Sequence, residues 1–257
     1  MYDIEREQRI LELLAEKHTI SVNRLAKLVY CSGSTIRRDL TRLVKKGLVT
    51  RTFGAVSLTS DTTNEETSFL VRENVNVTEK RAICKRAAEL LRSNITIFID
   101  SSTTMSYIVP FLNDFKNLLI ITNGIKIAND IVSKTNHRVY VVGGELMPHS
   151  NSILGSTAIN QISTFYADIA LLSCAGVTPE FGISEVTSDS AQFKYSMIKN
   201  SHKVIVGFDD DKIGSNKAFK TCLTEEVDVV IISKNAAEKY KKAVEKSKEK
   251  GVEFITF

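Results

Sequence analysis

The fold of the N-terminal part of this chain is decided by residues 32–46, which read SGSTIRRDLTRLVKK. The segment predicts a helix after Ser32, because a serine side chain can accept a hydrogen bond from the free N–H groups of a first helical turn. Side chains three and four residues apart share a helix face. One face is apolar and is expected to pack on a core: Ile36, Leu40, Leu43 and Val44. The opposite face is polar and basic: Ser34, Arg37, Arg38, Thr41 and Lys45.

The flanking residues predict a small domain around this helix. Apolar residues at helical spacing indicate a helix over residues 4–15, and Ser21 is an expected N-cap for a second helix over residues 22–29. Residues 18–20 break the helical pattern, and residues 30–33 predict a tight turn. Gly47 is expected to end the third helix. Residues 48–51 and 55–58 then predict the strands of a β-hairpin wing.

A short helix, a tight turn and a basic second helix form an arrangement that fits the major groove of DNA. Arginine can make a bidentate pair with guanine there. Arg37 and Arg38 project about 100° apart, so we expect one to reach a base edge and the other a phosphate. An ion pair with Asp39 is the structural alternative for Arg38, and Thr35 either contacts DNA or caps the first turn. Further phosphate contacts are expected from Arg42, Lys45, Lys46 and, on the wing, Arg51.

The charge distribution agrees with a DNA-binding head. The chain has 257 residues and a formal net charge of +4. Residues 1–58 contain 11 Lys and Arg against 6 Asp and Glu, whereas the remaining residues contain 23 against 24. A compact basic module on a near-neutral body is typical of a protein that binds a polyanion. A solvated helix face is the alternative that charge alone leaves open.

The rest of the chain predicts a second, larger domain. Residues 59–67 contain almost no apolar side chain and are expected to form a hinge, so we divide the chain into a head (1–58), a linker (59–77) and a body (78–257). Apolar runs in the body alternate with helical patterns, which is typical of a mostly parallel, Rossmann-like α/β sheet covered on both faces. The predicted strands are 95–99, 118–122, 138–142, 169–173, 203–208, 227–233 and 252–257. The predicted helices are 79–92, 106–112, 125–133, 188–199 and 236–250.

Polar or glycine-containing segments follow five of these strands, at the sheet edge where such folds bind ligands. Hydroxyls and free N–H groups at a helix N-terminus can cradle a phosphate, which is expected of Asp100, Ser101, Ser102, Thr103 and Thr104. The other four segments contain Asn123, the pair Gly143 and Gly144, residues 174–177, and the run from Asp209 to Lys212. Each alone could be a cap or a turn, but five together favour a ligand site.

These motifs resemble the DeoR family of bacterial transcriptional regulators. In the head the resemblance rests on the run TIRRDL at residues 35–40, within a longer helix-turn-helix pattern. In the body it rests on DSSTT at 100–104, VVGGEL at 141–146 and D-x-x-K-x-G at 209–214. The resemblance implies a winged helix-turn-helix domain followed by a domain related to ribose-5-phosphate isomerase that serves as a receptor for phosphorylated sugars.

The family resemblance also assigns residues to the effector site. It implies that Asp100, Ser101, Thr103 and Thr104 surround a phosphate or sugar. It places further residues at the pocket: Asn123, Gly143, Gly144, Lys194, Asp209 and Lys212. The sequence departs from the family pattern at three positions, where Ser102 stands for Gly, Met147 for Arg and Ser190 for Glu.

The function expected from these observations is that of a DNA-binding regulator, most often a repressor, of a carbohydrate-metabolism operon, controlled by a phosphorylated sugar. The expected partners are double-stranded operator DNA, the sugar phosphate and further copies of the chain in a homodimer or homotetramer, because one head reading one half-site binds weakly. The alternative is a sugar-phosphate isomerase-like enzyme fused to a DNA-binding head. Neither Glu145 nor Glu185, in a predicted polar loop, has an identifiable acid–base partner, so no enzyme and no catalytic residue are expected.

Composition excludes several other classes. The longest uncharged apolar run, residues 169–178, is about half the length that a bilayer span requires. The first residues show no basic-then-apolar signal, so a cytoplasmic protein without a membrane partner is expected. The four cysteines are scattered and do not cluster with the four histidines. Neither a disulfide framework, a metal site nor a cofactor is therefore expected.

Overall fold

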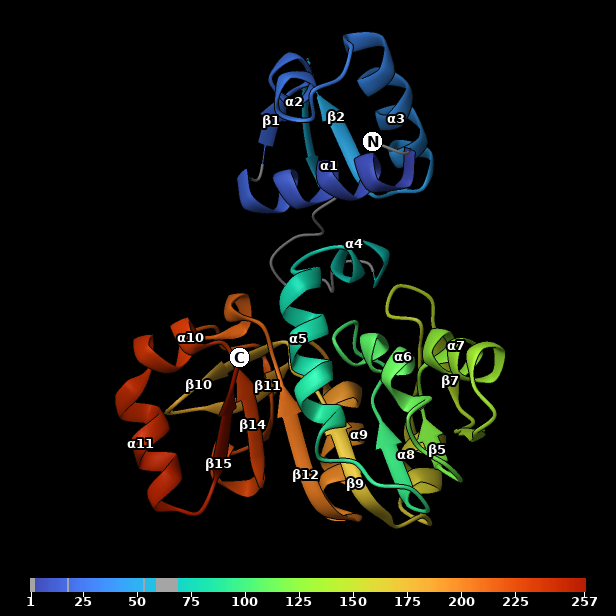
Figure 1. Cartoon of the computed structure of the whole chain (residues 1–257), viewed down its shortest axis with the longest axis vertical. Helices are drawn as coiled ribbons and strands as arrows, with labels where there is room; N and C mark the ends of the chain where they lie inside the picture. Colours follow the sequence, from blue (N-terminus) through green and yellow to red (C-terminus); the bar gives the residue numbers. More distant parts are fainter. Residues whose placement is uncertain (1–2, 18, 53, 59–68) are drawn as a thin grey trace. The chain divides into compact units, whose positions relative to one another are not determined.

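The computed structural model describes residues 3–17, 19–52, 54–58 and 69–257. The chain divides into two compact units, Met1–Val77 and Thr78–Phe257. Residues 59–68 of the predicted linker lie outside the described residues, and its later part contains the short helix α4 (Phe69–Glu73). The helices and strands of both units are labelled in Figure 1. Each unit has its own hydrophobic core.

The first unit is a winged helix-turn-helix domain, as predicted. Its helices before the wing are α1 (Asp3–Lys17), α2 (Val22–Leu28) and α3 (Gly33–Lys45). The wing strands β2 (Val49–Thr52) and β3 (Ala55–Leu58) pair antiparallel. A third strand, β1 (Thr19–Ser21), pairs with β3 and was not predicted. The sequence showed only a break in the helical pattern there, because a three-residue strand is too short to display a period.

The predicted caps of α2 and α3 are confirmed. The Ser21 hydroxyl accepts a hydrogen bond from the N–H of Arg24 at 3.3 Å, and the Ser32 hydroxyl accepts one from Thr35 at 3.1 Å. Gly47 follows the end of α3 with a φ of +70°, a conformation that glycine adopts without steric cost. The two serines and Gly47 therefore set the limits of the turn and of the third helix.

The buried face of α3 differs from the prediction at one residue. Ile36, Leu40 and Leu43 are fully buried, but Val44 is 43% exposed, so its placement in the core was wrong. At about 100° per residue, Val44 lies about 40° beyond Leu40, outside the arc that Leu40 and Leu43 define. Asp39 lies about 40° beyond Leu43 on the other side of that arc, and it is fully buried.

Buried Asp39 joins α3 to α1 through its charge. Its carboxylate accepts hydrogen bonds from Arg6 Nε at 2.5 Å and Arg6 Nη2 at 3.1 Å, and from Arg42 Nη2 at 2.5 Å. Arg42 Nε also donates to Glu7 of α1 at 2.8 Å. A buried charge is tolerated only when it is paired in this way. The network thus fixes the orientation of α3 on α1.

The second unit is built on a seven-stranded sheet in the order β15-β14-β12-β9-β4-β5-β6. All neighbouring strands are parallel. The strands are β4 (Thr96–Ile99), β5 (Leu119–Thr122), β6 (Arg138–Val141), β9 (Ala167–Leu172), β12 (Ser201–Gly207), β14 (Val229–Ile232) and β15 (Glu253–Thr256). All seven predicted strands and the Rossmann-like α/β class are confirmed.

Side chains of the central strands alternate between two cores, one on each face of the sheet. Ile97 and Ile99 of β4 contribute to one cluster, while Phe98 contributes to the other. On β9, Leu171 and Ala170 divide in the same way. Residues 97–99 and 169–172 of these strands are apolar at every position, and such runs need this double burial, which explains why they show no polar alternation.

Helices cover both faces. On one face lie α5 (Val77–Ala88), the 3-10 turn η1 (Met105–Ile108), α6 (Val109–Leu112) and α7 (Ile125–Lys134). On the other lie α8 (Ser156–Ile162), α9 (Ser188–Lys199), α10 (Lys234–Lys239) and α11 (Lys241–Glu249). The prediction for 188–199 matches α9, whereas 236–250 divides into α10 and α11, and α8 was not predicted. Among the described residues, no helix is long and apolar enough to cross a bilayer.

Short strands and turns that the sequence did not reveal complete the second unit. A hairpin is formed by β7 (Glu145–Met147) and β8 (Ser152–Leu154). A small antiparallel sheet consists of β10 (Gly176–Thr178), β11 (Gly182–Glu185) and β13 (Phe219–Cys222). Two 3-10 turns, η2 (Asp210–Lys212) and η3 (Thr224–Glu226), precede β13 and β14. Three or four residues per strand leave too little periodicity for recognition.

We expect Asp39→Asn to destabilise the first unit by about 3–5 kcal/mol, because it removes a buried carboxylate charge that the Arg6 and Arg42 guanidinium groups bind. Denaturant unfolding followed by circular dichroism measures the change. The matched control is Glu12→Gln, which breaks the exposed Arg9–Glu12 pair and is expected to cost less than about 1 kcal/mol. Equal effects of the two substitutions would contradict a structural role for Asp39.

Candidate functional site

The outer face of α3 presents uncompensated positive charge. Ser34, Arg37, Arg38, Thr41 and Lys45 are all exposed. Among the described residues, Arg37, Arg38 and Lys45 form no ion pair. The Thr41 hydroxyl donates to the carbonyl of Arg37 at 2.8 Å and so lies along the helix surface. This face can approach a polyanion without first breaking an internal contact.

Four residues predicted to contact DNA also make side-chain contacts within the domain, and one of them is Lys46, whose ammonium lies 2.6 Å from Glu7 Oε2. The Ser32 hydroxyl lies 2.8 Å from the hydroxyls of both Ser34 and Thr35, so the first turn of α3 is held together by its own side chains. Arg42 is partly exposed but is bound by the carboxylates of Glu7 and Asp39. Its geometry is that of a residue that positions α3. Arg51 is exposed on the wing strand β2.

The carboxyl ends of β4 and β5 are tied together in the second unit. The N–H of Ser101 donates to the side-chain oxygen of Asn123 at 3.1 Å, and the Asn123 amide donates to the Ile153 carbonyl at 3.2 Å. Asn123 is 2% exposed. A Cβ at Gly124 would lie 3.1 Å from the Ser101 Cα, so the two loops are in close contact. Asn123 therefore connects the β4 loop with the β7–β8 hairpin.

A buried ion cluster lies behind this edge. The Lys194 ammonium of α9 lies 2.6 Å from Glu185 Oε1, 3.3 Å from Asp100 Oδ2 and 2.8 Å from the Ser173 carbonyl. Burial alone would lower the pKa of Lys194, but the carboxylates of Glu185 and Asp100 outweigh it and raise that pKa above its ordinary value. The ammonium stays charged, and it bridges β4, β11 and α9.

Glu185 is the member of this cluster that the sequence reading missed. It was assigned to a polar loop without an acid–base partner, yet it lies on β11, is 6% exposed and binds Lys194. The family pattern has a Glu at the position of Ser190, four residues before Lys194. Here the carboxylate comes from a residue nine positions before the lysine, so only the folded strand could reveal it.

The predicted phosphate cradle is partly occupied by internal hydrogen bonds. Ser102 Oγ accepts a hydrogen bond from the N–H of Met105 at 3.1 Å, and Thr104 Oγ1 accepts one from the Ser173 hydroxyl at 3.3 Å. Thr103 and Thr104 are 5% and 2% exposed. Ser101 and Ser102 are the half-buried members of the run and form its accessible rim.

Gly144 allows a close approach between segments of the chain itself. Its φ is +149°, and a Cβ there would lie 2.5 Å from the Leu154 carbonyl oxygen of β8. The N–H of Gly143 donates to the Gln161 side chain of α8 at 2.5 Å. Both glycines are exposed. The sequence predicted close approach to a ligand here, and the contact that the structure records is with the β7–β8 hairpin and α8.

Acidic residues gather after β12, around η2. Asp209 is 2% exposed, and Lys212 is half-buried. The N–H of Asp210 donates to Glu79 of α5 at 3.1 Å. Burial raises the pKa of Glu79, the Asp210 N–H lowers it, and the carboxylates of Asp209, Asp210 and Asp211 raise it further. Glu79 is a second residue at this edge that the sequence reading missed.

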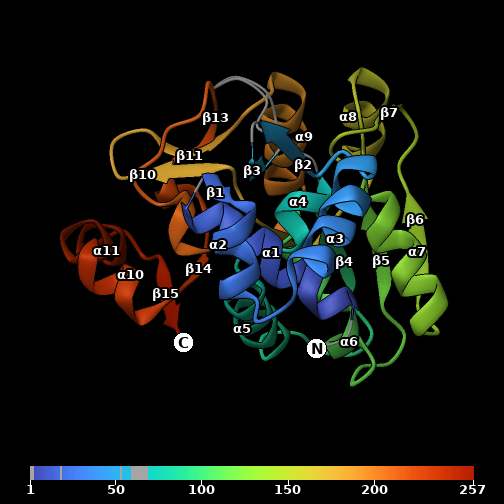
Figure 2. The same ribbon diagram turned by 90° about the horizontal axis from the view of Figure 1, so that it is seen from above.

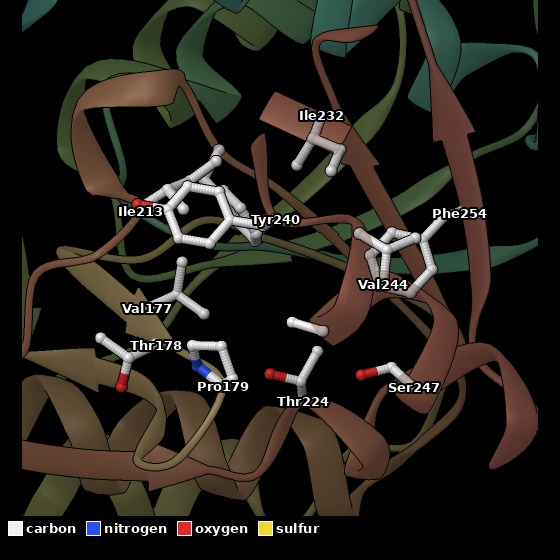
Figure 3. A pocket seen from close by; sticks show the side chains of 12 residues that line it. Val177, Thr178, Pro179, Ile213, Thr224, Ile232, Tyr240, Val244, Ser247 and Phe254 are labelled. Atoms are coloured by element: carbon white, nitrogen blue, oxygen red, sulfur yellow. The ribbon is translucent and has the colours of Figure 1, made fainter. Parts of the chain in front are cut away.

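An apolar cavity of about 50 Å³ lies between the small sheet, the end of the large sheet and α11 (Figure 3). Its lining includes Val177, Ile213, Tyr240 and Phe254, together with Thr178, Thr224 and Ser247. None of the lining residues is charged, and none is a predicted effector-binding residue. The chemistry of this cavity does not fit a phosphorylated sugar. Among the described residues, no group of His, Cys, Asp and Glu is arranged to hold a metal ion.

Two family models match the chain over most of its length. Residues 6–62 match the DeoR-like helix-turn-helix domain, and residues 75–234 match the DeoR C terminal sensor domain. A remote likeness to ribose 5-phosphate isomerase from Plasmodium falciparum has a TM-score of 0.40 at 12% identity over 54% of each chain, and it says nothing about activity.

Curated relatives match most of the length of this chain. The HTH-type transcriptional regulator GolR of Listeria innocua is 31% identical over 90% of this chain and 91% of its own length. The glycerol-3-phosphate regulon repressor of Escherichia coli is 31% identical over 84% of this chain and 85% of its own. YulB of Bacillus subtilis, named an uncharacterized HTH-type transcriptional regulator, is 33% identical over 96% and 95%. These proteins are named regulators, not enzymes.

We expect Lys194→Met to destabilise the second unit by about 3–5 kcal/mol, because it removes the cation shared by the buried carboxylates of Asp100 and Glu185. Thermal unfolding measures the change. Lys199→Met, at an exposed lysine of the same helix, serves as the control and should leave stability unchanged. A loss of stability no larger than that of the control would contradict a structural role for the ion cluster.

Proposed function

This chain belongs to the DeoR family of DNA-binding transcriptional regulators, and we propose that it represses a carbohydrate-metabolism operon under the control of a phosphorylated sugar. The observation that carries the proposal is the free basic face of α3, held in place by the buried Asp39 network. Support for the repressor role and the sugar phosphate comes from the relatives, one of which is named the glycerol-3-phosphate regulon repressor. The isomerase-like alternative lacks support, since the relatives are named regulators.

We propose that α3 enters the major groove and that the wing follows the backbone. Arg37 and Arg38 are the candidates for reading a base edge, since both guanidinium groups are exposed and unpaired among the described residues. Lys45 and Arg51 then contact phosphates, and Ser34 and Thr41 complete the contact surface. Thr35 and Arg42 support α3 from its N-terminus and from α1.

The proposed effector site lies at the carboxyl edge of β4 and β5. Ser101 and Ser102 form its rim, and Lys194 holds Asp100 in place from behind. Asp100 is 1% exposed and accepts hydrogen bonds from the N–H groups of Ser102 and Ser173, so we propose that it holds the loop in shape. The Ser101 and Ser102 hydroxyls are then the groups proposed to meet the phosphate or sugar. The remaining members of the proposed site are Thr103, Thr104, Asn123, Gly143, Gly144, Asp209 and Lys212.

Regulation requires that the effector bind one arrangement of head and sensor better than another. A ligand can shift the affinity for DNA only by its differential affinity for the two states. We propose a homodimer or homotetramer as the active form, because two heads on adjacent half-sites read more sequence than one head. Its place of action is then the cytoplasm, where operator DNA is found.

We expect Arg37→Ala or Arg38→Ala to abolish selective retention of operator DNA. A lost base contact costs about 1–3 kcal/mol of discrimination, whereas a lost phosphate contact weakens operator and random DNA equally and lowers the salt dependence. Gel shifts with both DNAs at several salt concentrations separate these roles. The control is Arg9→Ala on α1, whose guanidinium pairs with Glu12. Wild-type selectivity in both α3 variants would refute the assignment of this helix.

We expect a sugar phosphate to raise the melting temperature of the protein and to change its affinity for operator DNA. At 100 times its dissociation constant, a ligand that binds only the folded state stabilises it by about 2.7 kcal/mol. A thermal-shift screen of pentose, hexose and triose phosphates, followed by gel shifts with and without each hit, measures both effects.

Ser102→Asp should remove the response to the sugar phosphate. The new carboxylate can still accept the Met105 N–H, so the fold is kept, but its charge repels a phosphate. Asn160→Asp adds the same charge at an exposed site on α8 and should leave the response intact. If no sugar phosphate stabilises the wild-type protein, the sensor role fails, while the DNA-binding role is judged separately by the α3 variants.

A further inference from the structure

Strand β6 lies at one end of the large sheet and has a free outer edge. It pairs only with β5 among the described strands, and the order β4, β5, β6 can be followed outward in Figure 2. The N–H groups of Arg138 and Val142 donate to the Leu118 and Thr122 carbonyls on the β5 side. Because backbone groups alternate along a strand, the N–H and C=O groups of Val139 and Val141 point away from the sheet.

The side chains on this strand do not protect its edge. Tyr140 and Val141 are 46% and 40% exposed, and Leu146 of the following strand β7 is 53% exposed. Exposed edge strands usually carry charges, proline or a covering element that prevents pairing with another chain. Arg138 at the start of β6 is exposed and charged, but the three residues after it, Val139 to Val141, carry no charge. This part of the β6 edge is therefore apolar.

We propose that two copies of this chain pair antiparallel through β6 about a two-fold axis at Tyr140, so that their sheets become continuous. This inference rests on the proposed oligomeric form and assigns a surface to it. In this register Val139 lies opposite Val141 of the partner subunit, and the two residues exchange both backbone hydrogen bonds. Tyr140 then faces Tyr140 of the partner subunit as a non-hydrogen-bonded pair, in which side chains lie closest.

Charge complementarity favours a second copy over an unrelated protein. Arg138 begins β6 and Glu145 follows its carboxyl end, and neither forms an ion pair among the described residues. In the proposed register Arg138 lies opposite Val142 of the partner subunit, three residues before Glu145 of the partner subunit, so the opposite charges come to the same end of the joined strands. The two-fold axis repeats this match, as an isologous interface requires.

Light scattering coupled to gel filtration of the full chain tests the surface. Val141→Pro removes an outward N–H without breaking a bond to β5, and Tyr140→Glu places two negative charges opposite each other. We expect each variant to have half the wild-type mass, whether the wild type is a dimer or a tetramer, with an unchanged circular dichroism spectrum. Phe219→Glu, at an exposed aromatic residue on β13, should keep the wild-type mass.

A cross-linking measurement tests the register without weakening the interface. In a Cys31→Ser background, which leaves only buried cysteines, Tyr140→Cys should form an intermolecular disulfide under mild oxidation, whereas Phe219→Cys should not. Unchanged mass of both β6 variants, or no cross-link from Tyr140→Cys in an oligomeric protein, would overturn the β6 surface alone. A monomeric wild type would overturn the proposed oligomer as well.

Discussion

The ammonium of Lys194 is the contact on which the organisation of the sensor domain depends. It lies between carboxylates from β4 and β11 and is supported by the Ser173 carbonyl at the end of β9. Parallel strands already bring their carboxyl ends to one edge of the sheet, but loops at that edge have no regular hydrogen-bond pattern to fix them. A buried cation with several partners supplies the missing constraint. The rim formed by Ser101 and Ser102 is thereby placed on a rigid base.

The DNA-binding head also contains a buried ion with several partners, but this ion is an anion. Asp39 is a buried anion between two guanidinium groups, and it turns the helix so that Arg37 and Arg38 face outward. In both domains a buried ion helps to determine where the accessible polar groups lie, which are Arg37 and Arg38 in the head and Ser101 and Ser102 in the sensor domain.

The large elements could be predicted from sequence, because each has a long pattern or a strong local signal. All seven sheet strands, α9 and the serine caps of α2 and α3 are of this kind. What could not be predicted depends on contacts between distant segments. The pairing of Glu185 with Lys194 and the burial of Asp39 against Arg6 follow from packing, and strands such as β1 are too short to show a period. The assignment of the DNA-binding and effector-binding residues stays a prediction.

The double burial of the central strands changes what keeps them in register. In a strand with one solvent-exposed face, the alternation of polar and apolar residues fixes the register, since a slip by one residue would expose its apolar side chains. β4 and β9 place apolar side chains in a hydrophobic core on each face of the sheet. A slip by one residue would therefore move an apolar side chain from one core into the other. The register is then fixed by side-chain volume. If Ala170 and Leu171 exchanged positions, a void would form on one face of the sheet and a steric clash on the other. In the middle of this sheet, an apolar residue can therefore be replaced by another of similar volume, but a residue can be neither inserted nor deleted.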